Sequence, residues 1–270
     1  MEIMLIAIAS LCYLSYAVYS WVIGRRERSV YYLETLVNMI VMFLLVKAIF
    51  AFSSNVINNI LGGSVGISTI PSSRSLENIT DYFSSLHEYA VAWITYIAMT
   101  RTVIALTPFV SSLSQVIGSA TEWAVYELNI VATVTMALTI FSRVFITLMD
   151  YILFFGTLLT PIPHFRKIGS TLLSIYIVIG SLLFVIGDFA LSTQASLRNQ
   201  GLEPPRSDIE YLLRSINVLE WRTIIDKVAK VAWIMLDFVI KATFASVLAG
   251  IILVGFSIAL GGIYTWIQPF

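Results

Sequence analysis

The residues that could do chemistry in this sequence are ionisable side chains inside long apolar stretches. A charged group at the centre of an isolated membrane helix costs about 2.5 kcal/mol or more, so each such residue should face a partner or water. Residues of this kind usually mark a path for an ion or a substrate. The candidate pore-lining or buried charge network comprises Lys47, Arg101, Glu127, Arg143, Asp150, Asp188, Asp237 and Lys241.

Spacing separates these residues into two groups. Asp237 and Lys241 are four positions apart with the acid first, which is the favourable order for an ion pair on one helix. A self-neutralised pair near the membrane interface is the alternative to a functional role for them. Arg101, Glu127 and Arg143 are far apart in the sequence, and we expect a buried network or a wet lumen rather than side chains that reach individually to the interface.

The residue types needed for most enzymes are missing from any recognisable pattern. The sequence contains no hydrolase elbow, HExxH motif, phosphate-binding glycine loop or kinase-like motif set. Cys12 is the single cysteine, and the two histidines, His87 and His164, are isolated, so neither a disulfide nor a metal site is expected. We therefore expect no enzymatic activity and no cofactor.

The composition indicates a membrane protein. Hydrophobic residues make up 58% of the 270 residues and charged residues only 12%, against about a quarter in an ordinary soluble domain. The 16 basic and 16 acidic residues cancel, so no overall field would attract nucleic acid or anionic lipid. The fold class expected is all-α, a polytopic transmembrane protein in which residues 1–270 form one integral membrane domain.

Hydropathy predicts five to seven membrane-spanning helices, each of roughly 20 residues. The clear apolar segments are 3–23, 36–52, 168–191 and 231–267. Two middle stretches, 88–110 and 124–160, are apolar but interrupted by charges. Either only one of them crosses, or 88–110 crosses once and 124–160 crosses twice, with a tight reversal near Arg143. The total is five in the first case and seven in the second.

Basic residues predict the orientation. The first apolar run has no basic residue before it and is followed by Arg25, Arg26 and Arg28, which favours a retained helix over a cleaved signal peptide. It places the N-terminus outside and the basic end in the cytoplasm. The turn that contains Arg166 and Lys167 is expected on the cytoplasmic side too. The localisation expected is multi-pass, in the cell (plasma) membrane.

The expected order of segments alternates helices with two polar loops. It runs as an N-terminal helix pair 1–52, an extracellular loop 53–88, central helices 89–192, a polar loop 193–230 and a long C-terminal helix 231–270. The last helix has small residues suited to close helix packing, namely Ser246, Gly250, Gly255 and Ala259.

Each polar loop is predicted to contain an amphipathic helix outside the bilayer. One, at 207–219, follows two prolines and should lie on the membrane surface or on a partner. The other has a single apolar face made of Leu76, Ile79, Phe83 and Leu86. The same outer loop contains Asn78, which heads an Asn-Ile-Thr acceptor for N-glycosylation.

The turn between two apolar helices carries a family resemblance. It runs from Pro161 to Lys167 with two prolines and a basic pair, and Ile-Gly-Ser-Thr-Leu-Leu follows at 168–173. Together with a short first helix and an isoleucine-rich polytopic body, it resembles the CedA family, the polytopic membrane proteins of the crenarchaeal DNA-exchange (Ced) import system. That family is similar to the polytopic inner-membrane subunit of type IV secretion and conjugation systems.

The resemblance implies a subunit of a DNA-import apparatus in an archaeal cell membrane. Its partners would be membrane lipids, small pilin-like membrane subunits, a HerA-type cytoplasmic ATPase and the transported DNA. A ring of copies is expected, because five to seven helices can hardly enclose a DNA-sized pore, and basic side chains would offset the phosphate charge. The alternatives are a secondary transporter of a small solute and a non-conducting membrane scaffold that anchors a surface filament.

Overall fold

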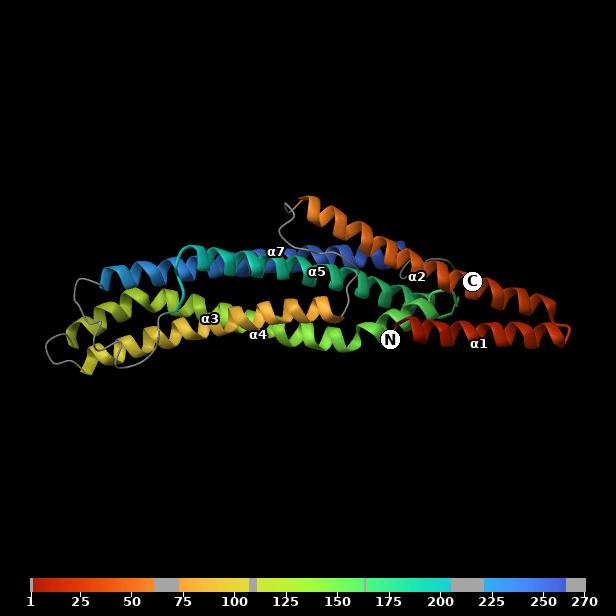
Figure 1. Ribbon diagram of the computed structural model, residues 1–270, viewed down its shortest axis with the longest axis horizontal. Coiled ribbons are helices and arrows are strands. Elements are labelled where there is room, and N and C mark those ends of the chain that lie inside the picture. The colour runs from red at the N-terminus through yellow and green to blue at the C-terminus, as the bar shows by residue number, and fades with distance from the viewer. Residues whose placement is uncertain (1, 61–72, 107–110, 163, 205–220, 261–270) are drawn as a thin grey trace. The chain divides into compact units, whose positions relative to one another are not determined.

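The computed structural model describes residues 2–60, 73–106, 111–162, 164–204 and 221–260, and these residues are helical apart from short turns between the helices (Figure 1). No strand occurs in these ranges. The all-α prediction is therefore confirmed. The helices are α1 (Glu2–Val22), α2 (Arg26–Ile60), α3 (Ser73–Leu106), α4 (Ser111–Leu159), α5 (Arg166–Asn199) and α7 (Trp221–Ala259).

Five of the described helices, α2, α3, α4, α5 and α7, are long and apolar enough to cross a membrane. The protein is thus a multi-pass membrane protein, and the number falls within the predicted five to seven. The helix α1, which the sequence analysis counted as a crossing, is not among the five. Its described apolar part, Ile6–Val22, is shorter than the roughly 20 residues that a crossing requires.

The helix α4 is continuous over 49 residues, which corresponds to about 74 Å at 1.5 Å per residue. The prediction of a tight reversal near Arg143 is therefore wrong. A reversal needs turn-forming residues, and residues 119–155 contain neither glycine nor proline. Since α3 and α4 are one candidate span each, two spans lie between the predicted outer loop and the turn at 161–167, not the one or three expected.

The predicted extracellular loop 53–88 is also largely helical. The helix α2 continues to Ile60, and α3 already begins at Ser73. The amphipathic segment expected inside this loop is the first part of α3, continuous with the apolar remainder, and Leu76, Phe83 and Leu86 are completely buried. The prediction of an apolar face on this segment was correct. The prediction of a separate loop helix was wrong, because these side chains pack in the protein core as part of α3. The second predicted amphipathic helix, at 207–219, lies outside the described residues.

The chain divides into two compact units, each of which combines segments that are distant in the sequence. The first unit contains Met1–Leu76, Val144–Phe184 and Ser246–Phe270, and the second contains Glu77–Arg143 and Val185–Ala245. The helices α4, α5 and α7 therefore contribute one part to each unit. In the second unit, buried side chains come from all four helical segments, with Trp93, Leu128, Ala190 and Phe238 as examples.

Glycines allow close packing of α4 and α5 in the first unit. A Cβ atom at Gly156 would lie 2.9 Å from the Leu173 side chain, and one at Gly169 would overlap the backbone of Leu159 and Thr160. At such positions only hydrogen fits. By contrast, a Cβ atom at Gly250 would meet nothing within 4 Å, so the small residue there is not used for packing inside the described chain.

The hairpin of α1 and α2 is the other motif of the first unit. The helix α1 ends through Gly24, whose φ of 81° is readily adopted only by glycine. The amide of Gly24 donates to the carbonyl of Trp21 at 3.0 Å, and that of Arg25 donates to the carbonyl of Ser20 at 2.9 Å. These bonds satisfy the last carbonyls of α1 and turn the chain directly into α2.

The exposed side chains of α4 change in character along the helix. In its first half they include Gln115, Ser119, Glu122, Asn129 and Thr133, interspersed with Trp123 and Tyr126. From residue 136 onwards they are mainly apolar, with Met136, Ile140, Phe141, Val144 and Leu148. The helix α7 shows the same change, from Asp226, Lys227 and Lys230 to Phe244, Val247, Leu248, Ile251 and Ile252.

Candidate functional site

The eight ionisable residues singled out in the sequence differ widely in exposure. Among the seven whose side chains the structure describes, only Asp188 is buried, with 9% of its surface accessible. The half-buried ones are Arg101, Glu127 and Asp150, and the exposed ones are Arg143, Asp237 and Lys241. Lys47 lies in α2, and its side chain is outside the described part of the structure.

Arg101 reaches from α3 to α4 in the second unit. Its guanidinium lies over Gly118, where an added Cβ would overlap it and would be 3.2 Å from both Cζ and Nε. The contact exists because Gly118 has no side chain. It places the positive charge of Arg101 near the start of α4, one turn from Thr121.

Glu127 lies further along α4 and does not share a site with the arginines. Nine residues separate it from Gly118, about 14 Å along the helix, and sixteen separate it from Arg143, about 24 Å. Its Oε2 atom is buried and has no hydrogen-bond partner among the described residues. The three residues, for which a buried network or a wet lumen was expected, occupy three different levels of the second unit.

Asp188 is held inside the second unit by close packing of α5 on α3. The preceding residue, Gly187, sits so near Ile79 that an added Cβ would be 2.8 Å from that side chain. No hydrogen bond or ion pair to the Asp188 carboxyl group is found within the described ranges. A buried carboxyl group without a partner costs free energy, so packing of its neighbours must hold it in place.

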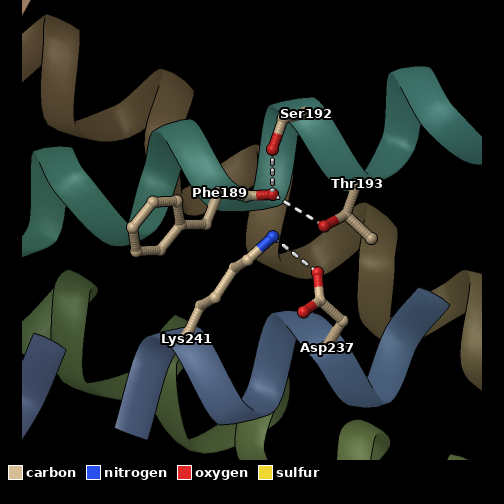
Figure 2. A network of polar contacts seen from close by, with 5 residues as sticks. All are labelled: Phe189, Ser192, Thr193, Asp237 and Lys241. Carbon is tan, nitrogen blue, oxygen red and sulfur yellow. Dashed lines mark hydrogen bonds and ion pairs between the residues drawn. The ribbon is translucent and has the colours of Figure 1, made fainter. Parts of the chain in front are cut away.

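Asp237 and Lys241 form the ion pair expected from their spacing, with Nζ 2.6 Å from Oδ2. Figure 2 shows both side chains directed toward α5, where the hydroxyl groups of Ser192 and Thr193 donate to the carbonyl of Phe189. Each charged side chain is 53% exposed. The pair thus lies at the edge of the bundle, where water can solvate it.

Replacing Asp237 with asparagine should therefore change stability little. Exposed ion pairs at this helical spacing contribute about 0.3–0.5 kcal/mol, so we expect a shift in melting temperature of no more than about 2 °C. Thermal unfolding of the purified chain followed by tryptophan fluorescence would measure the shift. A much larger fall would mean that the Lys241 ammonium depends on Asp237 for more than a surface contact.

Uncharged polar contacts connect the helices of the second unit, and the sequence analysis missed them. Thr80 and Ser142 share a buried hydrogen bond of 2.8 Å between α3 and α4. His87 Nδ1 lies 2.9 Å from the carbonyl oxygen of Ala132, so this histidine has a structural partner. These partners are 62 and 45 residues apart, and no local pattern identifies them.

Similar contacts tie α3 to α5 and to the segment that follows it. The Gln194 amide donates to the carbonyl of Tyr82 at 3.1 Å and also contacts the Ser85 hydroxyl. The Trp93 indole N–H donates to the carbonyl of Leu202 at 3.3 Å. Together they satisfy polar groups in an otherwise apolar core.

The remaining predicted residues lie on helices or beside the turn. Asn78 is exposed in the first turns of α3, not in a loop, and Thr80 of the same acceptor motif is buried. Arg166, the first residue of α5, is exposed, whereas Lys167 is half-buried. The Lys167 carbonyl accepts hydrogen bonds from the hydroxyls of Ser170 and Thr171, both at 2.9 Å.

A tyrosine-rich groove in the first unit is the main cavity feature that sequence reasoning missed. Its volume is about 500 Å³, and its walls come from α1, α2, the end of α4 and the turn after it. Tyr16 and Tyr32 face each other with ring centroids 5.9 Å apart. In the sequence, the only sign of the groove was that Tyr13 and Tyr16 precede the arginines at 25, 26 and 28, and Tyr31 and Tyr32 follow them. The lining residues are Ile8, Ala9, Cys12, Tyr13, Tyr16, Tyr31, Tyr32, Thr35, Phe154, Leu158 and Ile162.

Neither region has the side chains of a metal centre in the described part of the chain. No cluster of three or more histidine, cysteine, aspartate or glutamate side chains that could hold a metal occurs there. The second unit offers separated charges along a packed bundle, and the first offers an apolar groove. Comparison of the chain with protein-family models, with curated proteins and with solved structures gave no match, so function must be inferred from these residues.

Proposed function

We propose that this chain is a membrane platform subunit of an assembly that moves DNA across the membrane, with the passage lying between copies of the subunit. The resemblance of the turn at 161–167 and the polytopic body to the CedA family supports the DNA cargo. A separate HerA-type ATPase and small pilin-like subunits would complete the assembly. The five candidate spans suit a platform embedded in the bilayer.

The packing inside each unit favours a passage between copies. Large side chains fill the core of the second unit, among them Phe83, Trp93, Met235 and Phe238. The groove of the first unit, at about 500 Å³, has the size of a small-molecule site. Neither the filled core of the second unit nor the groove of the first could hold a nucleic acid. DNA would therefore have to move along surfaces that several copies form together.

Arg143 is the observation that carries this proposal. It is exposed on α4 among the exposed apolar residues Ile140, Phe141 and Val144. Arg143 has an interaction within the chain, yet it still exposes a charged surface among apolar side chains, where contact with lipid is unfavourable. A water-filled passage between copies, with phosphate groups in it, would place this charge favourably.

Genetic complementation tests the proposal. Deletion of the gene should abolish DNA transfer between cells, and unaffected transfer would refute it. In the deleted strain, Arg143→Gln should lower transfer at least about tenfold, while Arg143→Lys, which keeps the charge, should restore most of it. Arg198→Gln is the matched control, because the Arg198 side chain is 83% exposed at the end of α5, away from the exposed apolar residues of α4.

The same experiment separates a conduit from a scaffold. If deletion abolishes transfer but Arg143→Gln supports it fully with normal assembly, the chain anchors other components without contacting DNA. A small-solute transporter is less well supported, since such proteins usually have broken helices near the midplane. Gly180 and Gly187, which could have marked breaks, lie inside the uninterrupted helix α5, and Pro108 is outside the described residues.

A further inference from the structure

We infer that the groove of the first unit is a binding site for one acyl chain of an anionic phospholipid whose headgroup lies against the arginines at the α1–α2 turn. The inference is independent of what the assembly transports. A lipid is the expected occupant because α1 and α2 present apolar side chains to their surroundings along most of their length. Examples are Leu11, Val18, Val37 and Val41.

The dimensions and chemistry of the groove fit an acyl chain. On α1 the lining runs from Ile8 to Tyr16, about 12 Å along the axis, and the small side chains of Ala9 and Cys12 leave room for a chain. Phe154 and Leu158 of α4 form an apolar wall. The volume of about 500 Å³ falls in the range of small-molecule sites, and the lining is almost entirely apolar.

The hydroxyl groups of the groove come from α1 and α2, with Tyr13 and Thr35 further from the α1–α2 turn than the other three tyrosines. Tyr16, Tyr31 and Tyr32 lie at the end nearest the α1–α2 turn, and their rings combine an apolar body with a hydroxyl group. Tyr19 and Trp21, which follow toward the turn, are exposed. Exposed tyrosine and tryptophan of this kind are typical of the boundary between hydrocarbon and headgroups.

Three arginines continue this polar end. Arg25, Arg26 and Arg28 are all exposed at the turn, and the Arg26 guanidinium lies 5.5 Å from the centre of the Trp21 ring. Two carboxylates on the same stretch, Glu27 and Glu34, leave one net positive charge. Guanidinium groups bind phosphate oxygens in a bidentate manner, so a lipid phosphate is the group they suit best.

The single cysteine of the chain makes the site directly testable. Cys12 lines the groove, so a fluorophore attached to it reports a brominated acyl chain beside it. We would reconstitute the labelled full chain in phosphatidylcholine vesicles with a minor fraction of brominated lipid, either phosphatidylglycerol or phosphatidylcholine. Quenching should be about fivefold more effective with the anionic lipid, which corresponds to roughly 1 kcal/mol of headgroup preference.

Matched variants separate a site from general attraction to a basic surface. With Cys12→Ser and Leu14→Cys the label moves to an exposed position of α1 that does not line the groove, and both lipids should quench it equally. Ala9→Trp should fill the groove and abolish the preference at Cys12. Exchange of Arg25, Arg26 and Arg28 for glutamine should remove the preference for the anionic lipid. Both lipids should still quench the fluorophore. Equal quenching by both lipids at Cys12, or the same preference at position 14, would overturn the inference.

Discussion

Replacing Gly169 with alanine is expected to lower the melting temperature of the purified protein by at least about 5 °C, whereas the same change at Gly250 should leave it unchanged or raise it. A Cβ atom at Gly169 would lie 2.7 Å from Thr160 Oγ1 and 2.8 Å from the carbonyl carbon of Leu159. Backbone atoms cannot rotate away, so the helices would have to separate. Overpacking of this kind typically costs about 1–3 kcal/mol or more.

Two further glycines make this a graded test. A Cβ at Gly156 would lie 2.9 Å from two side-chain atoms of Leu173 and 3.1 Å from its backbone nitrogen, which is less severe than at Gly169, so Gly156→Ala should have a smaller effect. At Gly250 nothing lies within 4 Å, and alanine favours a helix over glycine by up to about 1 kcal/mol. Thermal unfolding in one detergent would give all three values. Equal melting of the Gly169 and Gly250 variants would show that α4 and α5 are not this close.

Replacing Asp188 with asparagine is expected to raise the melting temperature. The residue is 9% exposed, and its carboxyl group has no hydrogen bond or ion pair among the described residues. Asparagine has nearly the same size and no charge, and it removes a desolvation cost of about 1–3 kcal/mol. The expected rise is several degrees, measured against the Asp237→Asn variant, in which the exposed carboxylate is lost at little cost.

The Asp188 result also bears on function. A residue that destabilises the folded protein is retained more readily if it acts in function. Asp188→Asn should therefore combine higher thermal stability with reduced DNA transfer in the complementation assay. A fall in melting temperature would contradict the expectation, because it would mean that the carboxyl group makes a stabilising contact.

Hydropathy was sufficient to predict an all-helical membrane protein, because long apolar segments have few structural alternatives in a bilayer. The pairing of Asp237 with Lys241 also followed from sequence, since it depends only on helical spacing. The interruption at Arg143 was wrong for a physical reason. A charge does not break a helix, whereas proline does, and the absence of proline and of any turn-forming glycine from residues 119–155 was the better signal.

Tertiary partners were beyond the reach of local patterns. Leu76, Phe83 and Leu86 form the same apolar stripe whether it faces a bilayer surface or a bundle core, and only the structure shows the core. The Thr80–Ser142 hydrogen bond joins residues 62 positions apart. The groove exists because Cys12 of α1 and Phe154 of α4 line the same cavity. No periodicity in either helix predicts that these two residues meet.

The unbroken course of α4 has a consequence for bilayers of different thickness. Apart from its two ends, every backbone N–H of this 49-residue helix can bond four residues back, so sliding the helix along the membrane normal exposes no unpaired backbone group. Its depth is then determined by side chains alone, chiefly by Arg143 and by the change in exposed residues between Thr133 and Met136. Because hydrogen bonds fix α4 to α3, a thinner or thicker membrane is accommodated by a tilt or a change in depth of the packed helices together and not by local unfolding.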